Sequence, residues 1–469
     1  MDKGFFAGRK VLVMGLGRFG GGVDVAKFAC SAGAKVTVTD LAAADKLADS
    51  IDQLKDFKDI EFHLGSHEPA DFEKADIVIA NPAVPPDNKF LKIARQANRF
   101  VTSQINIFLE LCPAPIIGIT GSNGKSTTTA LTAHLLRSRR DRRVWLSGNI
   151  GNEPLLANID KIGPDDLVVL ELSSFQIEQF SQIQKSPKAA LLTNLTPNHL
   201  DRHGTYENYC AAKENIFKFQ KPDAHGRAIS IFNAEDKVSM EWFEKYKNDS
   251  GRICIKFSPD DVSKEIRKQF TLPGRANLSN LAAAIAIAKQ FGVKDAQIKA
   301  CLPKFKALPH RLEFVAQING VRWYNDSKAT TPASSIVALE SFEQPEIIIA
   351  GGYDKHLPFD EFGEKIAQKA KAAILIGQTA PKIADAIKAA QPNVLKMVSK
   401  PVLSVVERVE PFKIEFADSL AKAVELANQL AQPGDVVLLS TACASYDMFT
   451  NYEQRGEMFA ELVRKIPAK

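Results

Sequence analysis

Short apolar runs rich in β-branched residues alternate with longer segments of helical period along most of the chain. Strands are predicted over residues 10–15, 35–40, 75–80, 115–120, 166–172, 188–195, 346–352, 372–377 and 435–440. Such alternation is typical of parallel α/β sheets, in which each crossover between strands is usually a helix. We therefore expect an α/β protein.

Two glycine-rich turns divide this pattern. They lie between a strand and a helix at residues 15–22 and 121–126, too far apart for one short βαβ unit. They indicate two successive nucleotide-binding folds that join near CPAP (112–115), and a third α/β segment begins near LPHRLE (308–313). We expect three domains: a Rossmann-like domain over 1–111, a central P-loop ATPase-type parallel sheet over 112–307, and a C-terminal Rossmann-like domain over 308–469.

The composition is that of a packed globular protein, with 45% hydrophobic and 25% charged residues. The six cysteines have no zinc spacing, and the formal net charge of +5 is too mild to require nucleic acid. The basic run 137–143 follows a helix and lacks interleaved aromatics, so we interpret it as a solvated helix end. No apolar run approaches the ~18 residues of a membrane span, and the N-terminus lacks a signal-peptide core. We expect a cytoplasmic monomer that inserts in no membrane and binds no nucleic acid.

The first glycine-rich turn, GLGRFG (15–20), follows a strand and opens a helix, and Asp40 ends the next strand. This is the GxGxxG pattern, in which backbone N–H groups at a helix N-terminus receive a pyrophosphate. The acidic residue would accept hydrogen bonds from ring or ribose hydroxyls. NAD is the default ligand of the motif, although the motif specifies only a diphosphate, and glycines that merely allow tight strand–helix packing are the alternative.

The second turn, within GITGSNGKSTTT (118–129), predicts an ATP-binding phosphate loop. Its glycines let the backbone curl around an anion, Lys125 supplies a positive charge for the phosphates, and the Ser126 hydroxyl suits Mg²⁺. The spacing departs from GxxxxGK[ST], because Ile119 stands five positions before Gly124. The predicted loop residues are Gly121, Ser122, Asn123, Gly124, Lys125, Ser126 and Thr127.

Metal-dependent phosphoryl transfer also needs hard ligands near the phosphates. Glu171 ends one predicted strand, and His199 lies just beyond another. Ligands of α/β sheets gather beyond the carboxyl ends of strands, so both are candidates for the site. Lys213, judged from its own surroundings in the sequence, is a solvated lysine on a helix surface.

Six motifs occur in the order seen in the Mur ligases: GSNGKST, ELSSFQ, TPNHLDRHGTYENYCAAKENIF, LPHRLE, NDSKAT and ACASYDMFTNYEQRG. The chain resembles this family over almost its whole length, and the last two motifs are similar to those of its D-glutamate-adding branch. The resemblance implies that ATP activates the carboxylate of UDP-N-acetylmuramoyl-L-alanine as an acyl phosphate. The amine of D-glutamate would then attack it to form an amide.

The resemblance also implies two Mg²⁺ ions that screen the charge between triphosphate and carboxylate. Their ligands would be Ser126, Glu171, His199 and Lys213, with Lys213 carbamylated to serve as a carboxylate-like ligand. Lys125, His199, Lys213 and Lys328 would be the catalytic residues. Asn280, Arg311 and Asp326 would complete the ATP site.

The remaining implied contacts are with the two other substrates. The UDP-substrate would meet Gly17, Arg18, Phe19, Gly20, Asp40 and Asn149. D-glutamate would be held by Thr330, Lys355, Ser445 and the backbone at Tyr452, groups that suit a dicarboxylate. Arg18 and Phe19 replace the small or hydroxyl residue usual before the last glycine of the first turn.

Three alternatives stay open on the sequence. The first alternative is another ATP-dependent amide ligase, either a different Mur ligase or a folylpolyglutamate synthetase. The second alternative is a non-catalytic nucleotide sensor that keeps the fold as a switch. The presence of Lys125, Glu171, His199 and Lys213 together argues against it. An NAD oxidoreductase built on GLGRFG would bind nicotinamide, which a fluorescence titration with NADH would detect.

Overall fold

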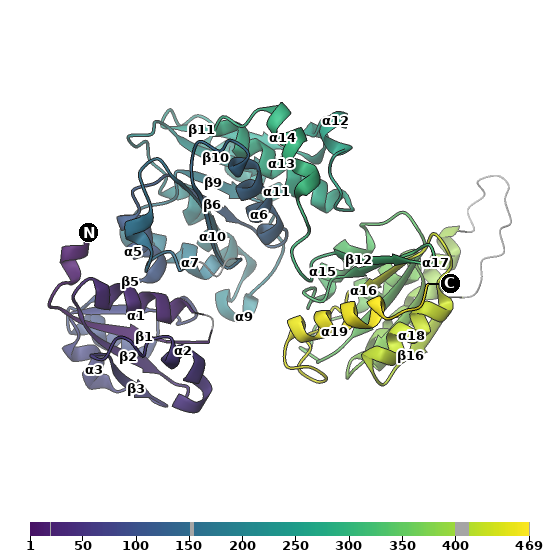
Figure 1. Cartoon of the computed structure of the whole chain (residues 1–469), viewed down its shortest axis with the longest axis horizontal. Coiled ribbons are helices and arrows are strands. Elements are labelled where there is room, and N and C mark those ends of the chain that lie inside the picture. The colour runs from purple at the N-terminus through teal and green to yellow at the C-terminus, as the bar shows by residue number, and fades with distance from the viewer. Residues whose placement is uncertain (19, 151–153, 399–411, 469) are drawn as a thin grey trace. The chain divides into compact units, whose positions relative to one another are not determined.

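The computed structural model describes residues 1–18, 20–150, 154–398 and 412–468. Within them the strands form three sheets, as Figure 1 shows. The chain divides into two compact units: the first unit is Met1–Ser263 with Asn280–Cys301, and the second unit is Lys264–Ser279 with Leu302–Lys469. The first unit holds the first two sheets and the second unit holds the third. The three-sheet α/β architecture is confirmed, while the expected domain limits stay a prediction.

The first sheet is parallel, with strand order β3-β2-β1-β4-β5. Its strands are β1 (Lys10–Met14), β2 (Lys35–Asp40), β3 (Glu61–Leu64), β4 (Ile77–Ala80) and β5 (Phe100–Ser103). Its helices are α1 (Gly21–Ser31), α2 (Ala48–Asp52), α3 (Pro69–Lys74), α4 (Lys89–Gln96) and α5 (Gln104–Leu111). The strand order reverses beside β1, and in doubly wound sheets ligands bind at such a switch point.

The second sheet is also parallel, with order β11-β10-β9-β6-β8-β7. Its strands are β6 (Ile116–Thr120), β7 (Val144–Gly148), β8 (Leu167–Glu171), β9 (Ala189–Leu192), β10 (Ala228–Asn233) and β11 (Arg252–Phe257). The helices of this part are α6 (Lys125–Arg137), α7 (Ser174–Glu178), α8 (Phe180–Ile183), α9 (Leu200–His203), α10 (Tyr206–Lys218), α11 (Lys237–Tyr246) and α14 (Asp295–Cys301). Helix α12 (Lys264–Arg267) belongs to the second unit, and α13 (Arg275–Gln290) is divided between the two units. Strands β6, β8 and β9 are buried along their whole length, as expected of strands covered on both faces.

The third sheet has the order β12-β13-β17-β14-β15-β16, and its β12–β13 hairpin is antiparallel. Its strands are β12 (Glu313–Ile318), β13 (Val321–Asn325), β14 (Glu346–Gly351), β15 (Ala370–Ile376), β16 (Lys413–Phe416) and β17 (Val436–Leu439). Its helices are α15 (Pro332–Leu339), α16 (Asp360–Lys369), α17 (Ala380–Val398), α18 (Leu420–Leu430) and α19 (Tyr452–Arg464).

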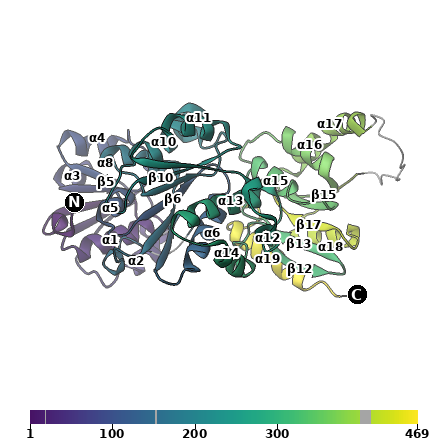
Figure 2. The same cartoon turned by 90° about the horizontal axis from the view of Figure 1, so that it is seen from above.

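Side chains of the third sheet alternate between two buried clusters. Ile348 and Leu438 face the cluster that includes α15, α16 and α17, whereas Ile347 and Leu439 face the cluster that includes α18 and α19. Figure 2 shows α16 and α17 together, away from α18 and α19. The period of two along each strand therefore places helices on both faces.

The predicted strands are present in all nine runs, although β9 ends three residues earlier than residue 195. Strands β3, β5, β7, β10, β11, β12, β13 and β16 were not predicted. Several of them are edge strands or short segments with polar positions, which carry a weak apolar signal. Among the described residues, no helix is long and apolar enough to cross a membrane.

Candidate functional site

The phosphate loop follows β6, the strand between β8 and β9. Ile119 of β6 pairs with Glu171 on one side and with Leu191 on the other. The carboxyl ends of three parallel strands therefore meet at one sheet edge. This register brings together the loop at 121–126, Glu171 and the segment that follows β9, as the sequence predicted for ligands at strand ends.

Gly121 and Gly124 are required by the shape of this loop. Their φ angles are +149° and +79°, a region that favours glycine. A Cβ at Gly121 would overlap Thr193 Oγ1, and one at Gly124 would overlap Asn280 Oδ1. Asn280, predicted from the resemblance as an ATP contact, thus lies against the loop, and it accepts a hydrogen bond from Thr128 Oγ1 at 3.2 Å.

The segment after β9 holds the loop through polar contacts that the sequence did not predict. Asn194 accepts from the Ser122 N–H through its backbone oxygen at 2.8 Å and from the Asn123 N–H through Oδ1 at 2.9 Å. Thr193 Oγ1 donates to the Asn123 carbonyl at 2.6 Å. The Lys125 ammonium donates to the carbonyls of Gly121 and Ser122 at 3.1 and 2.9 Å. The available signal was the polar TNLT run directly after an apolar strand.

Lys213 is buried, with 2% of its surface exposed, so the interpretation as a solvated surface lysine is wrong. It points from α10 toward the end of β6, where Nζ donates to Thr120 Oγ1 at 3.0 Å and lies 5.0 Å from the Tyr209 ring centroid. Burial lowers the pKa of its ammonium well below the usual value; the Lys125 charge acts the same way, and Glu171 opposes it.

Glu171 is 4% exposed, and its Oε2 has no hydrogen-bond partner within the described part of the chain. A buried carboxylate oxygen left open in this way fits a Mg²⁺ ligand, as does the buried Ser126 hydroxyl at the start of α6. No group of three His, Cys, Asp or Glu side chains suited to a metal occurs among the residues that the structure describes. An ammonium cannot ligate a cation, so Lys213 would fit a metal site only after conversion to an anionic group.

His199 begins α9 in left-handed backbone geometry, with φ at +53°. Its side chain is exposed, and the ring centroid lies 5.2 Å from that of Phe175. Partial desolvation and then the charges of Lys125 and Lys213 lower the pKa of its imidazole, which favours the neutral form that a metal ligand needs. His203, which the sequence analysis missed, contacts the Ser174 hydroxyl through Nε2 at 2.9 Å.

Asp40 holds the first glycine-rich turn through hydrogen bonds to backbone N–H groups. Its carboxylate accepts from the Gly17 N–H at 3.0 Å and from the Ala42 N–H at 2.8 Å. Gly22, beyond the GLGRFG motif, is the closely packed glycine: a Cβ there would lie 2.6 Å from Leu16 Cα. Arg18 is exposed, Gly20 precedes α1 with φ at +84°, and Phe19 lies outside the described residues. Asn149 is exposed, and its N–H donates to the Glu171 carbonyl at 3.2 Å.

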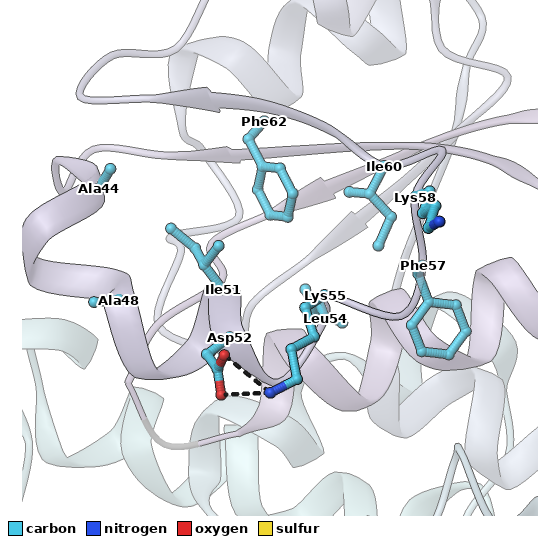
Figure 3. A pocket seen from close by; sticks show the side chains of 10 residues that line it. All are labelled: Ala44, Ala48, Ile51, Asp52, Leu54, Lys55, Phe57, Lys58, Ile60 and Phe62. Atoms are coloured by element: carbon cyan, nitrogen blue, oxygen red, sulfur yellow. Dashed lines mark hydrogen bonds and ion pairs between the residues drawn. The ribbon is translucent and has the colours of Figure 1, made fainter.

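A hollow of the first domain lies between α2 and the edge of the sheet (Figure 3). Its lining includes Ile51, Leu54, Phe57 and Phe62, with Lys55 donating to Asp52 at 3.2 Å. None of the predicted site residues lines it. The hollow therefore adds nothing to the predicted nucleotide sites.

In the second unit, the loops after β13, β17 and β14 leave three neighbouring strands at one sheet edge. They carry Thr330, Ser445 and Lys355, three of the predicted D-glutamate contacts. The Tyr452 carbonyl accepts from the Ser327 hydroxyl at 2.8 Å, and Lys328 Nζ lies 5.3 Å from the Tyr452 ring centroid. Ser445 is buried, whereas Lys355 is an exposed residue whose pKa is lowered by partial desolvation of its ammonium.

Asp326 is buried and accepts from Ser440 Oγ at 2.8 Å and from the Leu312 N–H at 3.1 Å. Burial raises the pKa of this carboxyl to about 7 against the opposing effect of those bonds. The neighbouring LPHRLE segment is strained, because His310 and Leu312 have φ angles of +61° and +44°. Arg311 lies between them, and such strain is concentrated at functional sites.

Arg455, absent from the predicted site, connects the loops of this edge. Its guanidinium donates to the Ser327 hydroxyl and carbonyl at 2.9 and 2.8 Å and to the Cys443 carbonyl at 3.2 Å. It is 1% exposed, and burial lowers its pKa to about 10. The arginine thereby fixes the segment that carries Lys328 and Thr330 against the one that carries Ser445.

Comparison with known families matches all three parts of the chain. Residues 9–103 match the Mur ligase MurD-like N-terminal domain, residues 119–271 the Mur ligase middle domain, and residues 310–443 the Mur ligase glutamate ligase domain. Each match contains one of the three sheets or most of it. The family resemblance expected from the motifs is confirmed.

Relatives that match over almost the whole chain support the same family. The chain is 40% identical to the UDP-N-acetylmuramoylalanine–D-glutamate ligase of Roseiflexus sp., over 98% of this chain and 99% of that protein. It is 37% identical to the protein of the same name from Acetivibrio thermocellus, over 98% and 97%. It is 36% identical to the one from Pelotomaculum thermopropionicum, over 98% of both.

Solved structures show the same fold. The UDP-N-acetylmuramate-alanine ligase MurC from Thermotoga maritima aligns with a TM-score of 0.56 at 21% identity, over 97% of this chain and 99% of that one. MurF from Acinetobacter baumannii aligns with a TM-score of 0.54 at 15% identity, over 99% and 93%. With three matching domains and full-length relatives at 36–40% identity, the chain belongs to the Mur ligase family.

Proposed function

We propose that this chain is an ATP-dependent ligase that joins D-glutamate to UDP-N-acetylmuramoyl-L-alanine in peptidoglycan precursor synthesis. The observation that carries the proposal is its end-to-end match, at 40% identity, to a ligase named for that reaction. The phosphate loop, with Gly121 and Gly124 in glycine-specific geometry, supports the use of a nucleoside triphosphate.

In the first step, a carboxylate oxygen of the UDP-substrate bonds to the γ-phosphorus of ATP, and the bond to the β-bridging oxygen breaks. The loop residues from Gly121 to Thr127 hold the phosphates, and Lys125 stays with the transferred group. Mg²⁺, when bound, screens the charge between triphosphate and carboxylate. Ser126 and Glu171 would hold one ion and His199 a second, with carbamylated Lys213 as a further ligand.

In the second step, the D-glutamate amine attacks the acyl carbon and passes an N–H proton to solvent, and the C–O bond to phosphate breaks to leave an amide. Thr330, Lys355, Ser445 and the backbone at Tyr452 orient the amino acid, and Lys328 stabilises the charge on the phosphate or on the tetrahedral oxygen. Asn280, Arg311 and Asp326 contact the rest of ATP. Gly17, Arg18, Phe19, Gly20, Asp40 and Asn149 bind the UDP-substrate.

Lys213 acts as a carbamate. Because burial destabilises its charged form, a neutral amine is available to attack CO₂. The new N–C bond forms as one N–H proton passes to solvent, which turns the neutral amine into an anionic oxygen ligand. This role accounts for a lysine that is buried beside Thr120 and has no carboxylate of the described residues in hydrogen-bond contact.

The test is phosphate release from ATP and UDP-N-acetylmuramoyl-L-alanine, with D-glutamate, L-glutamate, L-alanine or meso-diaminopimelate added singly. We expect release that depends on D-glutamate alone. Release with another amino acid would keep the ligase chemistry but refute the assignment of the second unit. A parallel titration with NADH should show no nicotinamide binding, and saturable binding would instead favour an oxidoreductase.

A further inference from the structure

Arg202 is a half-buried arginine that no predicted role uses. It lies in α9, three residues after His199, and its side chain is 16% exposed. Nη2 donates to the Val84 carbonyl at 3.4 Å and lies 3.5 Å from Glu178 Oε2, whereas the buried Nε has no hydrogen-bond partner among the described residues. Both contacts of Nη2 are at the long end of the hydrogen-bond range, so the protein satisfies this guanidinium only loosely.

Glu178 is a poor partner for the arginine. Its Oε2 is buried and makes no hydrogen bond within the described part of the chain. Desolvation raises the pKa of the Glu178 carboxyl; the Arg202 charge opposes this shift without cancelling it, and the Asp87 charge adds to it. An ion pair in good geometry would favour the charged carboxylate instead. Arg202 therefore keeps donors for another oxyanion.

On one side, Arg202 contacts the turn that follows β4, which packs on the glycine-rich turn of the first sheet. The Val84 N–H donates to the Asn81 carbonyl at 2.9 Å and so closes the turn. The Asn81 side chain lies against the glycine-rich turn: a Cβ at Gly15 would lie 2.9 Å from Asn81 Cβ, and one at Gly17 would lie 3.9 Å from Nδ2. One short turn thus separates Arg202 from the proposed diphosphate contact.

On the other side, Arg202 and His199 share an aromatic neighbour. The Phe175 ring centroid lies 5.4 Å from Arg202 Cζ and 5.2 Å from the His199 ring centroid. The proposed UDP-substrate extends from Gly17 to the metal ligand His199, and all these residues belong to the first unit. Arg202 therefore lies beside both ends of the path that this anionic substrate would follow.

We infer that Arg202 binds an oxyanion of the UDP-substrate, whose two such groups are the diphosphate and the carboxylate that receives the phosphoryl group. A guanidinium presents paired N–H donors with the spacing of phosphate or carboxylate oxygens, which suits either group. This inference rests on the proposed function for the identity of the substrate. Val84 and Glu178 lie outside the phosphate loop, so ATP binding should not depend on Arg202.

The test compares Arg202→Ala with the wild type by titration calorimetry of UDP-N-acetylmuramoyl-L-alanine, UDP and ATP, each measured separately. We expect the Kd for UDP-N-acetylmuramoyl-L-alanine to rise about tenfold or more, because a charge-assisted hydrogen bond is lost, and the Kd for ATP to stay the same. An equal rise for UDP would identify the diphosphate as the bound group, and an unchanged Kd for UDP would identify the carboxylate. An unchanged Kd for UDP-N-acetylmuramoyl-L-alanine, or an equal loss of ATP binding, would overturn the inference.

The matched control is Arg139→Ala. Arg139 is also half-buried, donates to a backbone carbonyl, that of Phe291, and pairs with a carboxylate, that of Asp141. It lies just beyond the end of α6 that is opposite the phosphate loop, so all three Kd values should stay at the wild-type level.

Arg202→Gln separates substrate binding from a purely structural role, and it covers the case in which Arg202→Ala does not fold. Glutamine keeps an N–H donor for the Val84 carbonyl but removes the charge, so the Kd for UDP-N-acetylmuramoyl-L-alanine should rise as in the alanine variant. A wild-type Kd in Arg202→Gln would show that Arg202 only holds the turn after β4, and would overturn the inference. Wild-type protein that binds the UDP-substrate but releases no phosphate with D-glutamate would refute the proposed function instead, while the Kd comparison would still decide the role of Arg202.

Discussion

Lys213 illustrates how one side chain decides the chemistry of a site. Its ammonium lies among Lys125, Glu171 and Thr120, where burial disfavours the charge that lysine normally carries. Energetically such a group is stable only as a neutral amine or as a modified, metal-bound anion. Lys218, on the same helix, is exposed to solvent.

Lys213→Ala is expected to abolish phosphate release at low bicarbonate, because the proposed carbamate ligand is lost. Short carboxylates such as acetate should restore part of the activity by occupying the vacated space near Glu171. Lys218→Ala, on the exposed side of α10, serves as the control and should keep wild-type rates. Unsupplemented Lys213→Ala at full activity would contradict the carbamate role.

Lys355 is the exposed cation proposed to bind D-glutamate. Lys355→Ala should raise the KM for D-glutamate at least tenfold and change the KM for ATP little, because a charge-assisted hydrogen bond to a carboxylate is lost. Initial-rate kinetics with each substrate varied in turn will show this. The matched control is Lys382→Ala, whose ammonium is already paired with Asp354 at 2.5 Å. Equal changes in both KM values for Lys355→Ala would refute its assignment.

Among the elements, α19 connects two loops through one buried residue. Its N-terminal turn supplies the Tyr452 carbonyl to Ser327, and Arg455 one turn later reaches both Ser327 and Cys443. Gly456, the next residue, lets His310 approach the helix, since a Cβ there would overlap His310 Nδ1. The helix packs on β12 and β13, so it fixes the loop after β13 relative to the sheet.

Arg455→Lys should destabilise the second unit by roughly 2–4 kcal/mol, because one ammonium cannot replace a guanidinium that bonds several buried acceptors. The KM for D-glutamate should rise with it, while phosphate-loop binding of ATP stays intact. Chemical denaturation and initial rates measure the two effects. Arg464→Lys, exposed near the end of the same helix, is the control, and a similar loss in that variant would contradict the role of Arg455.

For the whole molecule, two compact units imply two unfolding transitions. Glu346, at the start of β14, gives the second unit its own pH dependence. Its side chain is fully buried, and neither carboxyl oxygen has a hydrogen-bond partner among the described residues. Burial raises its pKa to about 8, with the Lys369 charge opposing.

Below pH 4.5 Glu346 is protonated in both states and has no effect on stability. As the pH rises from there to about 8, the unfolded chain loses this proton before the folded one, so the second unit becomes less stable. Between pH 6 and 8 the expected loss is roughly 2–3 kcal/mol. Calorimetric melting of Glu346→Gln should lack this slope, whereas Glu340→Gln, an exposed control paired with Lys365, should retain it. A slope that persists in Glu346→Gln would contradict this origin.

Much of the fold followed from local patterns. Most predicted strands are buried parallel strands, whose continuous apolar runs can be recognised without knowing their partners. Strand β10 is also buried throughout, but Ser230 and Asn233 interrupt its apolar run, and it was not predicted. The glycine-rich turns could also be recognised from the sequence, because the positive φ angles at Gly121 and Gly124 are ones that glycine adopts most readily. Edge strands such as β3 and β16, with half-exposed side chains, give no comparable signal.

The sequence by itself determined the α/β class, the two glycine-rich turns between strand and helix, and the family, since these depend on local spacing and on motifs in a given order. The tertiary structure decided which groups meet. In the folded chain Lys213 is buried, and Asp40 accepts a hydrogen bond from the Gly17 N–H. Gly22 is the glycine that packs closely against the backbone of Leu16. Segments that are distant in the sequence are joined by hydrogen bonds of Asp24, Asn194 and Arg455. The physical reason is that hydrogen bonding and burial depend on the order of strands across each sheet, which no single stretch of the chain contains.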